Sequence, residues 1–350
     1  MRNGRIVTSP IETEDGAGPV AVDDGQVAAE RPEADQLVGR SPGQLMWIRF
    51  KRDRSGVISA YVVGFFFLVG ILAPLIGKLY GKNPYTVYAD ERPELFDSAG
   101  VPVQPNGGIS GEFWFGLEPG NGYDVFTKLI YGIRTSLMIS VAVTIAVVIT
   151  GILLGVTAGY IGGKVDYGIS RLIDFLLAFP SQLFFIASMP VVVSLFVSPR
   201  DETPTYVRVV ALIAVQWVLG WMSLARILRG TALALREREF IEAAKVSGAP
   251  PWRIIRKEVL PNVVTPLLVQ ATYLLPNFVT IEAGLSFLGV GIVEPTPDWG
   301  QMFSKASTEL VQQNDITYMF FPGVSMIIFV VAFNLLGDSV RDAFDPKTAR

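Results

Sequence analysis

Six long stretches without Asp, Glu, Lys or Arg are the feature that most restricts how this chain of 350 residues can fold. They comprise residues 55–77, 135–163, 175–199, 209–225, 259–281 and 316–337. A helix crosses a bilayer with about 20 apolar residues, and it satisfies its own backbone hydrogen bonds where water is absent. We therefore predict an all-α membrane protein with six transmembrane helices.

Composition agrees with a membrane protein and excludes several kinds of chemistry. Charged residues make up 17% of the chain and its mean hydropathy is +0.42, whereas soluble domains carry about 25% charged residues. The absence of Cys and His excludes thiol catalysis, disulfides, Cys/His zinc sites and a Ser-His-Asp triad. We identify no catalytic residue and no metal site, and we expect the chain not to be an enzyme. The net charge of −3 gives no reason to expect a nucleic-acid partner.

The distribution of Lys and Arg predicts the orientation of the chain in the membrane. Eight of the 29 Lys and Arg residues lie in the loop 226–258, and loops rich in these residues stay in the cytoplasm. Six spans place both termini on one side of the membrane. We therefore predict that the N-terminus, this loop and the C-terminus are all cytoplasmic.

The six stretches divide the chain into segments with different expected roles. Residues 1–45 are rich in acids, Gly and Pro and have no aromatic residue, which is typical of a disordered tail. We expect this cytoplasmic tail to be followed by a first transmembrane helix (46–80), an extracytoplasmic loop rich in Pro and Gly (81–130), a core with five transmembrane helices (131–338) and a cytoplasmic tail (339–350).

Glu282 is the ionisable residue that most clearly interrupts an apolar run. One interpretation is a polar group at the outer end of the fifth helix, or packed inside the bundle. The other is a contact for substrate or an ion in a transport pathway, because carboxylates inside membranes are often functional. Both interpretations stay open at this point.

The sequence contains no loop that would bind the phosphates of ATP. The nearest approach is Gly162-Gly163-Lys164, but Ala158 stands where that motif needs Gly, and Val165 stands where it needs Ser or Thr. If transport is active, a partner or an ion gradient must supply the energy. We expect the chain itself to bind no cofactor.

The basic loop 226–262 has the pattern of a short helix, a turn and a second short helix. Good helix formers precede Gly248, and Gly suits the left-handed residue at a helix stop. Pro250 and Pro251 suit the first turn of a following helix. The pattern therefore predicts two short helices connected at Gly248.

The first of these helices carries residues that favour docking to a partner. Ala243 and Ala244 leave a low surface that can enter a groove. Glu242 offers a directed acceptor and is spaced to pair with Arg238 and Lys245 on one helix face. The alternative is a solvated connecting loop with ordinary charge pairs.

Glu242-Ala243-Ala244, then Gly248, then Leu260-Pro261 resembles the EAA motif of binding-protein-dependent ABC importers. In that family the loop forms a coupling helix that docks on the ATPase subunit. Glu258 departs from the general pattern, which has an apolar residue there. The resemblance implies that the coupling residues are Glu242, Ala243, Ala244, Gly248, Leu260 and Pro261.

Further segments resemble the dipeptide, oligopeptide and nickel group of this family, and within it the DppC/OppC-type permease subunit. They comprise residues 115–126, 129–137, 174–180, 282–289, 295–300 and 332–346. Tyr123 departs from the pattern, since the family usually has Arg there. The resemblance extends over roughly residues 45–347 and implies the transmembrane domain of a type I ABC importer in the cytoplasmic (inner) membrane.

The same resemblance implies the partners and the transport cycle. A second homologous permease subunit, two ATP-binding subunits and an extracytoplasmic substrate-binding protein would complete an importer of di- or oligopeptides. ATP would be bound by the partner subunits, and closure of the ATPase dimer would move the coupling helices and open the cavity outward. The alternative class is an ion-coupled secondary transporter, which would work without an ATPase and depend on a proton or sodium gradient.

Overall fold

The computed structural model describes residues 42–344 except 199, 309–310, 313–314 and 316. The chain divides into two units, Met1–Leu45 and Met46–Arg350. Because the described residues are 42–344 with those gaps, most of the predicted tail 1–45 lies outside them. The end of the predicted tail 339–350 lies outside them as well. Everything below concerns the second unit, apart from the first turn of helix α1 (Pro42–Arg52).

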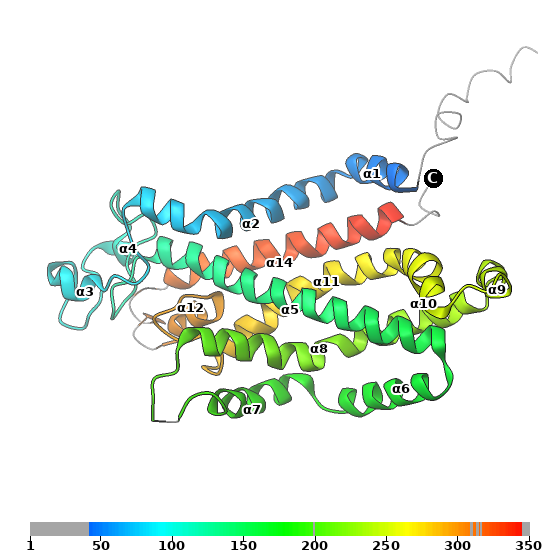
Figure 1. Ribbon diagram of the computed structural model, residues 1–350. Helices are drawn as coiled ribbons and strands as arrows, with labels where there is room; N and C mark the ends of the chain where they lie inside the picture. The colour runs from blue at the N-terminus through cyan, green and yellow to red at the C-terminus, as the bar shows by residue number, and fades with distance from the viewer. Residues whose placement is uncertain (1–41, 199, 309–310, 313–314, 316, 345–350) are drawn as a thin grey trace, which may run out of the picture. The chain divides into compact units, whose positions relative to one another are not determined.

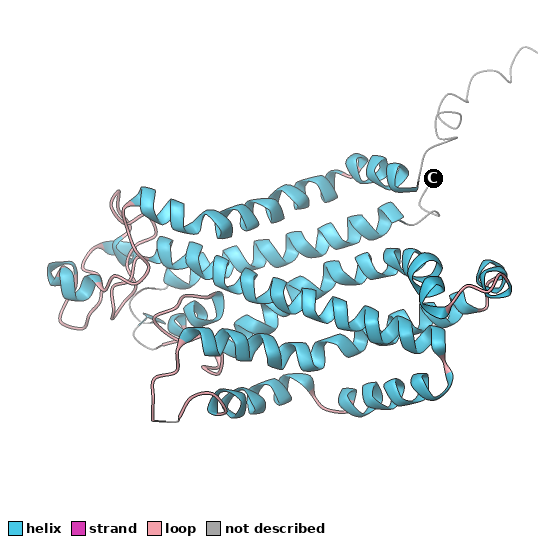
Figure 2. Cartoon of the chain, viewed as in Figure 1, coloured by secondary structure: helices cyan, strands magenta, loops and turns pink. Residues whose placement is uncertain are grey.

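The regular structure of the described residues is entirely helical (Figures 1 and 2), which confirms the predicted fold class. Five helices are long and apolar enough to cross a membrane. They are α2 (Arg54–Tyr80), α5 (Val125–Ile161), α8 (Thr205–Arg236), the continuous segment Pro251–Phe287 that ends in α11 (Leu260–Phe287), and α14 (Thr317–Phe344).

The predicted third span differs from expectation, because the stretch 175–199 is not one straight helix. Its residues are divided between α6 (Gly163–Leu177) and α7 (Ser181–Ser194), which meet at an angle of 86°. Pro180 lies at the break, where it has no N–H to donate and disfavours helical geometry at Phe179. The pair is therefore a broken span or a re-entrant loop, and the bundle has five or six spans accordingly.

Aspartate side chains determine where two of the long helices begin. Asp53 caps α2 by accepting hydrogen bonds from the backbone N–H groups of Ser55 and Gly56 at 3.0 and 3.1 Å. The segment 46–80 is thus divided into α1 and α2 at this residue. Asp124 caps α5 through the Thr127 N–H at 2.7 Å, so α5 begins inside the segment that was expected to be loop.

Helix α5 lies at the centre of the bundle and packs against α2, α8 and α11. Three glycines, four residues apart, allow α8 to approach it closely, as small residues commonly do between membrane helices. A Cβ atom would lie 2.8 Å from the Leu224 side chain at Gly151, 2.5 Å from the Ala225 carbonyl at Gly155, and 2.5 Å from the Arg229 carbonyl at Gly159.

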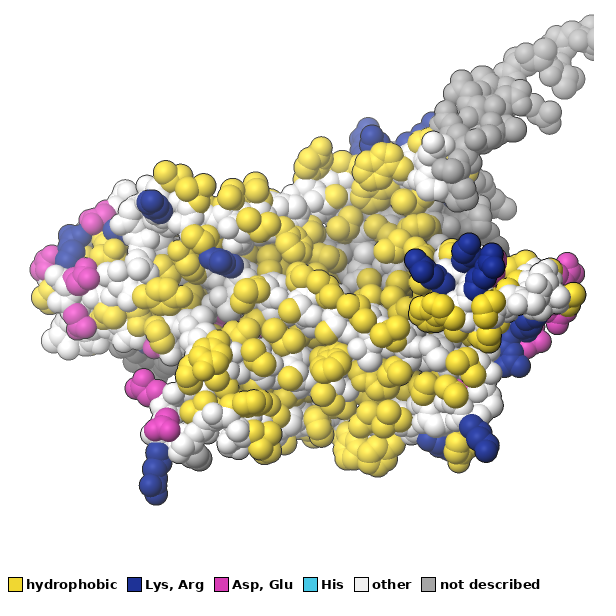
Figure 3. Space-filling model, in the orientation of Figure 1, with side chains coloured by type: hydrophobic (Ala, Val, Ile, Leu, Met, Phe, Trp, Pro, Cys, Tyr) yellow, Lys and Arg dark blue, Asp and Glu magenta, His cyan; other side chains and the backbone are white. Residues whose placement is uncertain are grey.

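The bundle has two ends that differ in structure. The start of α2, the end of α14 and the short helix α9 (Glu239–Val246) lie at one end, which we call the α9 end (Figure 1). The helices α3 (Tyr88–Glu91), α4 (Pro105–Gly108) and α12 (Trp299–Ala306) lie at the other, the α12 end. Apolar side chains cover the surface between the ends, and most charged side chains gather at the ends (Figure 3).

Candidate functional site

The helix α9 projects at one end of the bundle (Figure 1) and is held to it by Ile241. Ile241 is fully buried in the main hydrophobic core. Its neighbours Glu242 and Ala243 are exposed, and Ala244 is half-buried. Ile241 and Ala244 therefore pack α9 against the core, and Glu242 and Ala243 face outward.

The stop at Gly248 is formed as the sequence predicts. Gly248 has a φ of +77°, a left-handed conformation that Gly adopts at little cost. Its N–H donates to the Lys245 carbonyl at 2.9 Å, and the Ala249 N–H donates to the Ala244 carbonyl at 3.1 Å. These two bonds form a Schellman motif, which ends α9 in one defined direction.

The predicted ion pairs of Glu242 are not formed. Among the described residues, no hydrogen bond or ion pair involves the carboxylate of Glu242, either with Arg238 or with Lys245. Lys245 instead directs its Nζ to the Arg236 carbonyl at 3.5 Å. The carboxylate of Glu242 is therefore exposed and available to a group outside this chain.

The second helix of the loop is continuous with a long helix of the bundle rather than separate from it. The helix α10 (Pro251–Ile254) begins at Pro251, passes into a π-helical turn (Ile255–Val259) and continues as α11. Pro261 explains the wider turn, because it has no N–H for the carbonyl four residues earlier and its ring crowds that position. Leu260 is half-buried and Pro261 is exposed.

The loop is joined firmly to the bundle by its apolar side chains. Ile254 and Val259 have exposed fractions of 2% and 0% and belong to the main core. The turn at Gly248 and the π-helical turn thus connect α9 to α11.

Sequence reasoning missed three exposed apolar side chains beside Glu242. Phe240, Val246 and Trp252 have exposed fractions of 41%, 89% and 65%. They lie on the same loop as the acidic residue, at an end of the bundle where charged groups gather. Single apolar residues within a charged loop give little signal in a sequence, because exposed apolar residues are common on protein surfaces.

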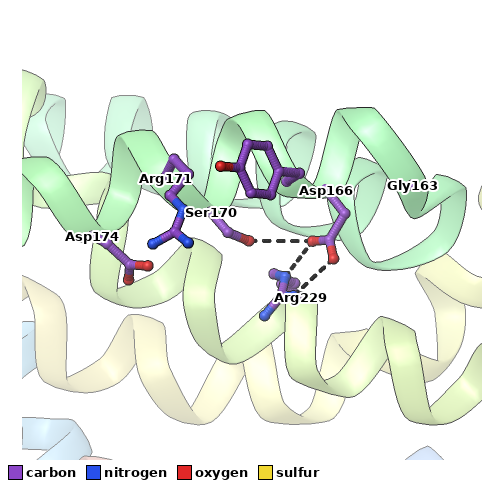
Figure 4. A pocket seen from close by; sticks show the side chains of 7 residues that line it. Gly163, Asp166, Ser170, Arg171, Asp174 and Arg229 are labelled. Atoms are coloured by element: carbon purple, nitrogen blue, oxygen red, sulfur yellow. Dashed lines mark hydrogen bonds and ion pairs between the residues drawn. The ribbon is translucent and has the colours of Figure 1, made fainter.

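A polar depression on α6 and α8 was also missed. It has a volume of about 490 Å³ and is lined by Asp166, Ser170, Asp174 and Arg229, among others (Figure 4). Arg229 donates to Asp166 from two nitrogen atoms, with the Nη2–Oδ2 pair at 2.8 Å. Arg226 contacts Asp174 at 2.7 Å. These pairs connect α6 to α8 in the region where the sequence indicated only a boundary between spans.

Glu282 lies far from this loop along α11, next to Asp298 at the α12 end. Both side chains are fully buried. Both oxygens of Glu282 and Oδ2 of Asp298 lack a donor among the described residues. Asp298 caps α12 through the Gln301 N–H, and burial raises the pKa of Asp298 to about 6. Both interpretations of Glu282, a polar group packed in the bundle and a contact in a transport pathway, therefore stay predictions.

A second buried charge cluster lies at the same end and centres on Glu118. Its Oε2 is 2.5 Å from Lys128 Nζ and accepts a hydrogen bond of 2.7 Å from the hydroxyl of Tyr318. Lys128 Nζ also lies 3.5 Å from Glu294. The cluster thus joins the segment before α5 to α5, to the loop before α12 and to α14. Among the described residues no group of three or more Asp or Glu is arranged to hold a metal ion.

Known families and proteins match most of the chain. Residues 151–350 match the family described as binding-protein-dependent transport system inner membrane component. Residues 41–94 match the N-terminal TM domain of oligopeptide transport permease C. Together the two matches include α1, α2, the loop with α9 and the C-terminal helices.

Individual relatives align over nearly the whole chain. The chain is 35% identical over 316 residues to the dipeptide transport system permease protein DppC of Alkalihalophilus pseudofirmus. The aligned residues make up 90% of this chain and 93% of that protein. It is 35% identical over 312 residues to the oligopeptide transport system permease protein OppC of Escherichia coli K12, with coverages of 89% and 93%. Among solved structures, the inward-facing MetNI methionine ABC transporter matches with a TM-score of 0.49 and 22% identity, covering 63% of this chain and 97% of the matched chain.

Proposed function

Because the chain belongs to the binding-protein-dependent transport system inner membrane components, as a DppC/OppC-type permease, we propose that it forms half of the translocation pathway of an ATP-driven importer of di- and oligopeptides. It is a multi-pass membrane protein and a transport permease subunit. The peptide substrate is inferred from the printed names of relatives that are 35% identical over about nine tenths of the chain.

The observation that carries the proposal is the geometry of the loop 239–261. Glu242 is exposed without a partner among the described residues, while Ile241 and Ile254 on either side of the turn are buried in the core. A docked ATPase would therefore find a free carboxylate and the exposed Ala243 on α9, which the turn at Gly248 joins to α10 and the continuous α11. A hydrogen bond from the ATPase to this carboxylate would be charge-assisted, and charge-assisted hydrogen bonds are roughly twice as strong as neutral ones.

The proposal includes the partners and the orientation. A second homologous permease, two ATP-binding subunits and an extracytoplasmic binding protein complete the importer, and ATP binds to the ATPase subunits and not to this chain. The α9 end, with the start of α2 and the end of α14, faces the cytoplasm, and the α12 end faces outward; both termini are proposed to be cytoplasmic. The basic loop 226–258 supports this orientation.

In this proposal the chain works by alternating access. Closure of the ATPase dimer moves α9, and the direction fixed at Gly248 transmits that movement to α10 and α11. The bundle then opens its pathway outward, where the binding protein releases the peptide. The residues that dock on the ATPase and orient α9 are Glu242, Ala243, Ala244 and Gly248. The helix that moves is α11, which begins with Leu260 and Pro261.

Two measurements test this proposal. Purification of the tagged chain from its own membrane should recover an ATPase subunit, and uptake of di-, tri- and pentapeptides should be lost when its gene is deleted. Uptake should stop when ATP is depleted and should survive collapse of the proton and sodium gradients. Uptake that follows an ion gradient without any ATPase would instead support a secondary transporter.

A further inference from the structure

A stripe of polar side chains follows one face of α11 through its middle. Gln270, Tyr273, Asn277 and Thr280 recur at intervals of three and four residues, so they lie on one side of the helix. Asn334 of α14 joins them, and the five line an open groove of about 420 Å³ between the two helices. We call these five residues the carboxamide groove.

The amides of this groove have no hydrogen-bond partners in the part of the chain that the structure describes. No hydrogen bond to another described residue is made by the side chains of Gln270, Asn277 or Asn334. By contrast, Tyr273 donates to Asp338 at 2.5 Å and Thr280 donates to the Pro276 carbonyl at 2.9 Å. Asn277 is exposed, and Gln270 and Asn334 are half-exposed. The groove therefore presents three amides that are free to bind something outside the chain.

Contact with lipid hydrocarbon would be energetically unfavourable for a helix face that carries free amides. An amide placed in hydrocarbon without a hydrogen bond is costly, and polar residues within membrane helices generally face water-filled cavities or other protein. The three amides lie on two helices that are apolar enough to cross a membrane. The face that carries them is thus directed at water, substrate or protein.

We propose that the carboxamide groove binds the main chain of the transported peptide, an inference that rests on the proposed function. A carboxamide offers both a carbonyl acceptor and N–H donors, which match the N–H and C=O groups that every peptide repeats. No charged side chain lines the groove, so it does not select by the charge of the peptide's side chains or termini.

Labelling of a single cysteine tests whether the groove faces the pathway. The native chain has no Cys, so Asn277→Cys in the complete transporter reports one position. We expect a membrane-impermeant thiosulfonate to label it in right-side-out or inside-out vesicles, and saturating tri-alanine with the binding protein to slow labelling at least threefold. Leu68→Cys, on the exposed apolar surface of α2, is the matched control and should stay unlabelled.

Uptake by variants of similar volume tests the amides themselves. The double substitution Asn277→Leu and Asn334→Leu should lower tri-alanine uptake at least about tenfold, the effect of losing two hydrogen bonds of ordinary net strength. Gln216→Met removes a carboxamide that is fully buried in α8 and bonded to the Leu212 carbonyl, and it should leave uptake unchanged. Each variant is compared at equal membrane level.

The outcomes separate this inference from the proposed function. If the unsubstituted transporter lacks an ATPase partner or does not import peptide, the proposed function fails. If the unsubstituted transporter imports tri-alanine, any of three results overturns only the proposal that the groove binds peptide. Asn277→Cys is unlabelled from both sides, its labelling rate is unchanged by peptide, or the double variant imports normally. Loss of the second permease from the purified double variant also overturns it, because the face would then be a contact between permeases.

Discussion

The Nζ atom of Lys128 lies 2.5 Å from Oε2 of Glu118, and neither side chain is exposed. Lys128 belongs to the first turns of α5, a helix of 37 residues. Such a helix is about 55 Å long, whereas the hydrocarbon core is about 30 Å thick. The pair therefore belongs to the cap of polar structure that covers one end of the bundle.

Breaking this pair should destabilise the α12 end. Lys128→Met leaves the carboxylate of Glu118 buried with Tyr318 and a more distant Lys305 at 3.6 Å. We expect a loss of about 3–5 kcal/mol, because most of the cost comes from the charge that is left unpaired. Thermal unfolding of the purified subunit measures it.

The double variant Lys128→Met and Glu118→Gln is the control for that experiment. It removes both charges, so it should recover much of the lost stability. A Lys128→Met subunit that unfolds at the same temperature as the unsubstituted chain would contradict the account of this cluster.

The carboxyl pair of Glu282 and Asp298 should make stability depend on pH. Burial raises the pKa of Asp298 to about 6, so protonation of Asp298 stabilises the folded state at low pH, and this contribution is lost as pH rises through about 6. Lys128 is the cation whose charge acts against this shift. Asp298→Asn keeps a good helix cap and stays neutral, so it should unfold at a higher temperature than the unsubstituted chain at pH 7.5.

That difference in unfolding temperature should shrink as pH falls through about 6, and it should vanish only below the ordinary Asp pKa of 3.8, where Asp298 is protonated in both the folded and the unfolded chain. Comparing the two proteins at each pH cancels the titration of carboxylates that do not contact Asp298. An unfolding-temperature difference that is the same at pH 5 and pH 7.5 would show that the pair does not titrate in this range.

The proposed orientation of the bundle predicts the side from which single cysteines are labelled. Ser307 ends α12 and is exposed, so Ser307→Cys should react with an impermeant reagent added outside. Val246→Cys, on α9, should react only in inside-out vesicles. Labelling of Ser307→Cys from the cytoplasmic side alone would reverse the topology.

The long spans and the turn at Gly248 could be predicted from the sequence because each depends on local signals. Uncharged runs indicate α2, α5 and α14 directly, and Gly followed by two prolines indicates where α9 ends and α10 begins. The bend at Pro180 was missed because uncharged residues continue through it. A proline inside an apolar run does not by itself predict a break in the helix, because neighbouring residues can restore the helical geometry.

The buried pairs could not be predicted because their members lie far apart in the sequence. Lys128 looked like the charged end of a loop, and only the fold brings Tyr318 to Glu118. The carboxamide groove is an intermediate case: the spacing of Gln270, Asn277 and Thr280 is visible in the sequence, but the position of Asn334 beside them requires the packing of α14 on α11.

The turn at Gly248 should be needed for coupling but not for insertion. Gly248→Val forces a branched residue into a left-handed conformation, at a cost of about 1–2 kcal/mol, and should tilt α9 away from the ATPase. Peptide uptake should fall while the amount of subunit in the membrane stays normal. Gly230→Val, at a helical glycine with open space around it, is the matched control and should transport normally.

The central claim is that Glu242 connects this chain to an ATPase, and the most direct test is the affinity of the ATPase subunits for the permease in detergent. Glu242→Ala should weaken binding by about 2–5 kcal/mol, or at least roughly 30-fold in Kd, because the cationic or N–H donor on the ATPase loses its partner. Glu239→Ala, an exposed acid on the same helix, should bind within twofold of the unsubstituted chain. Equal Kd values for Glu242→Ala and the unsubstituted chain would contradict the account and leave α9 as a simple connector.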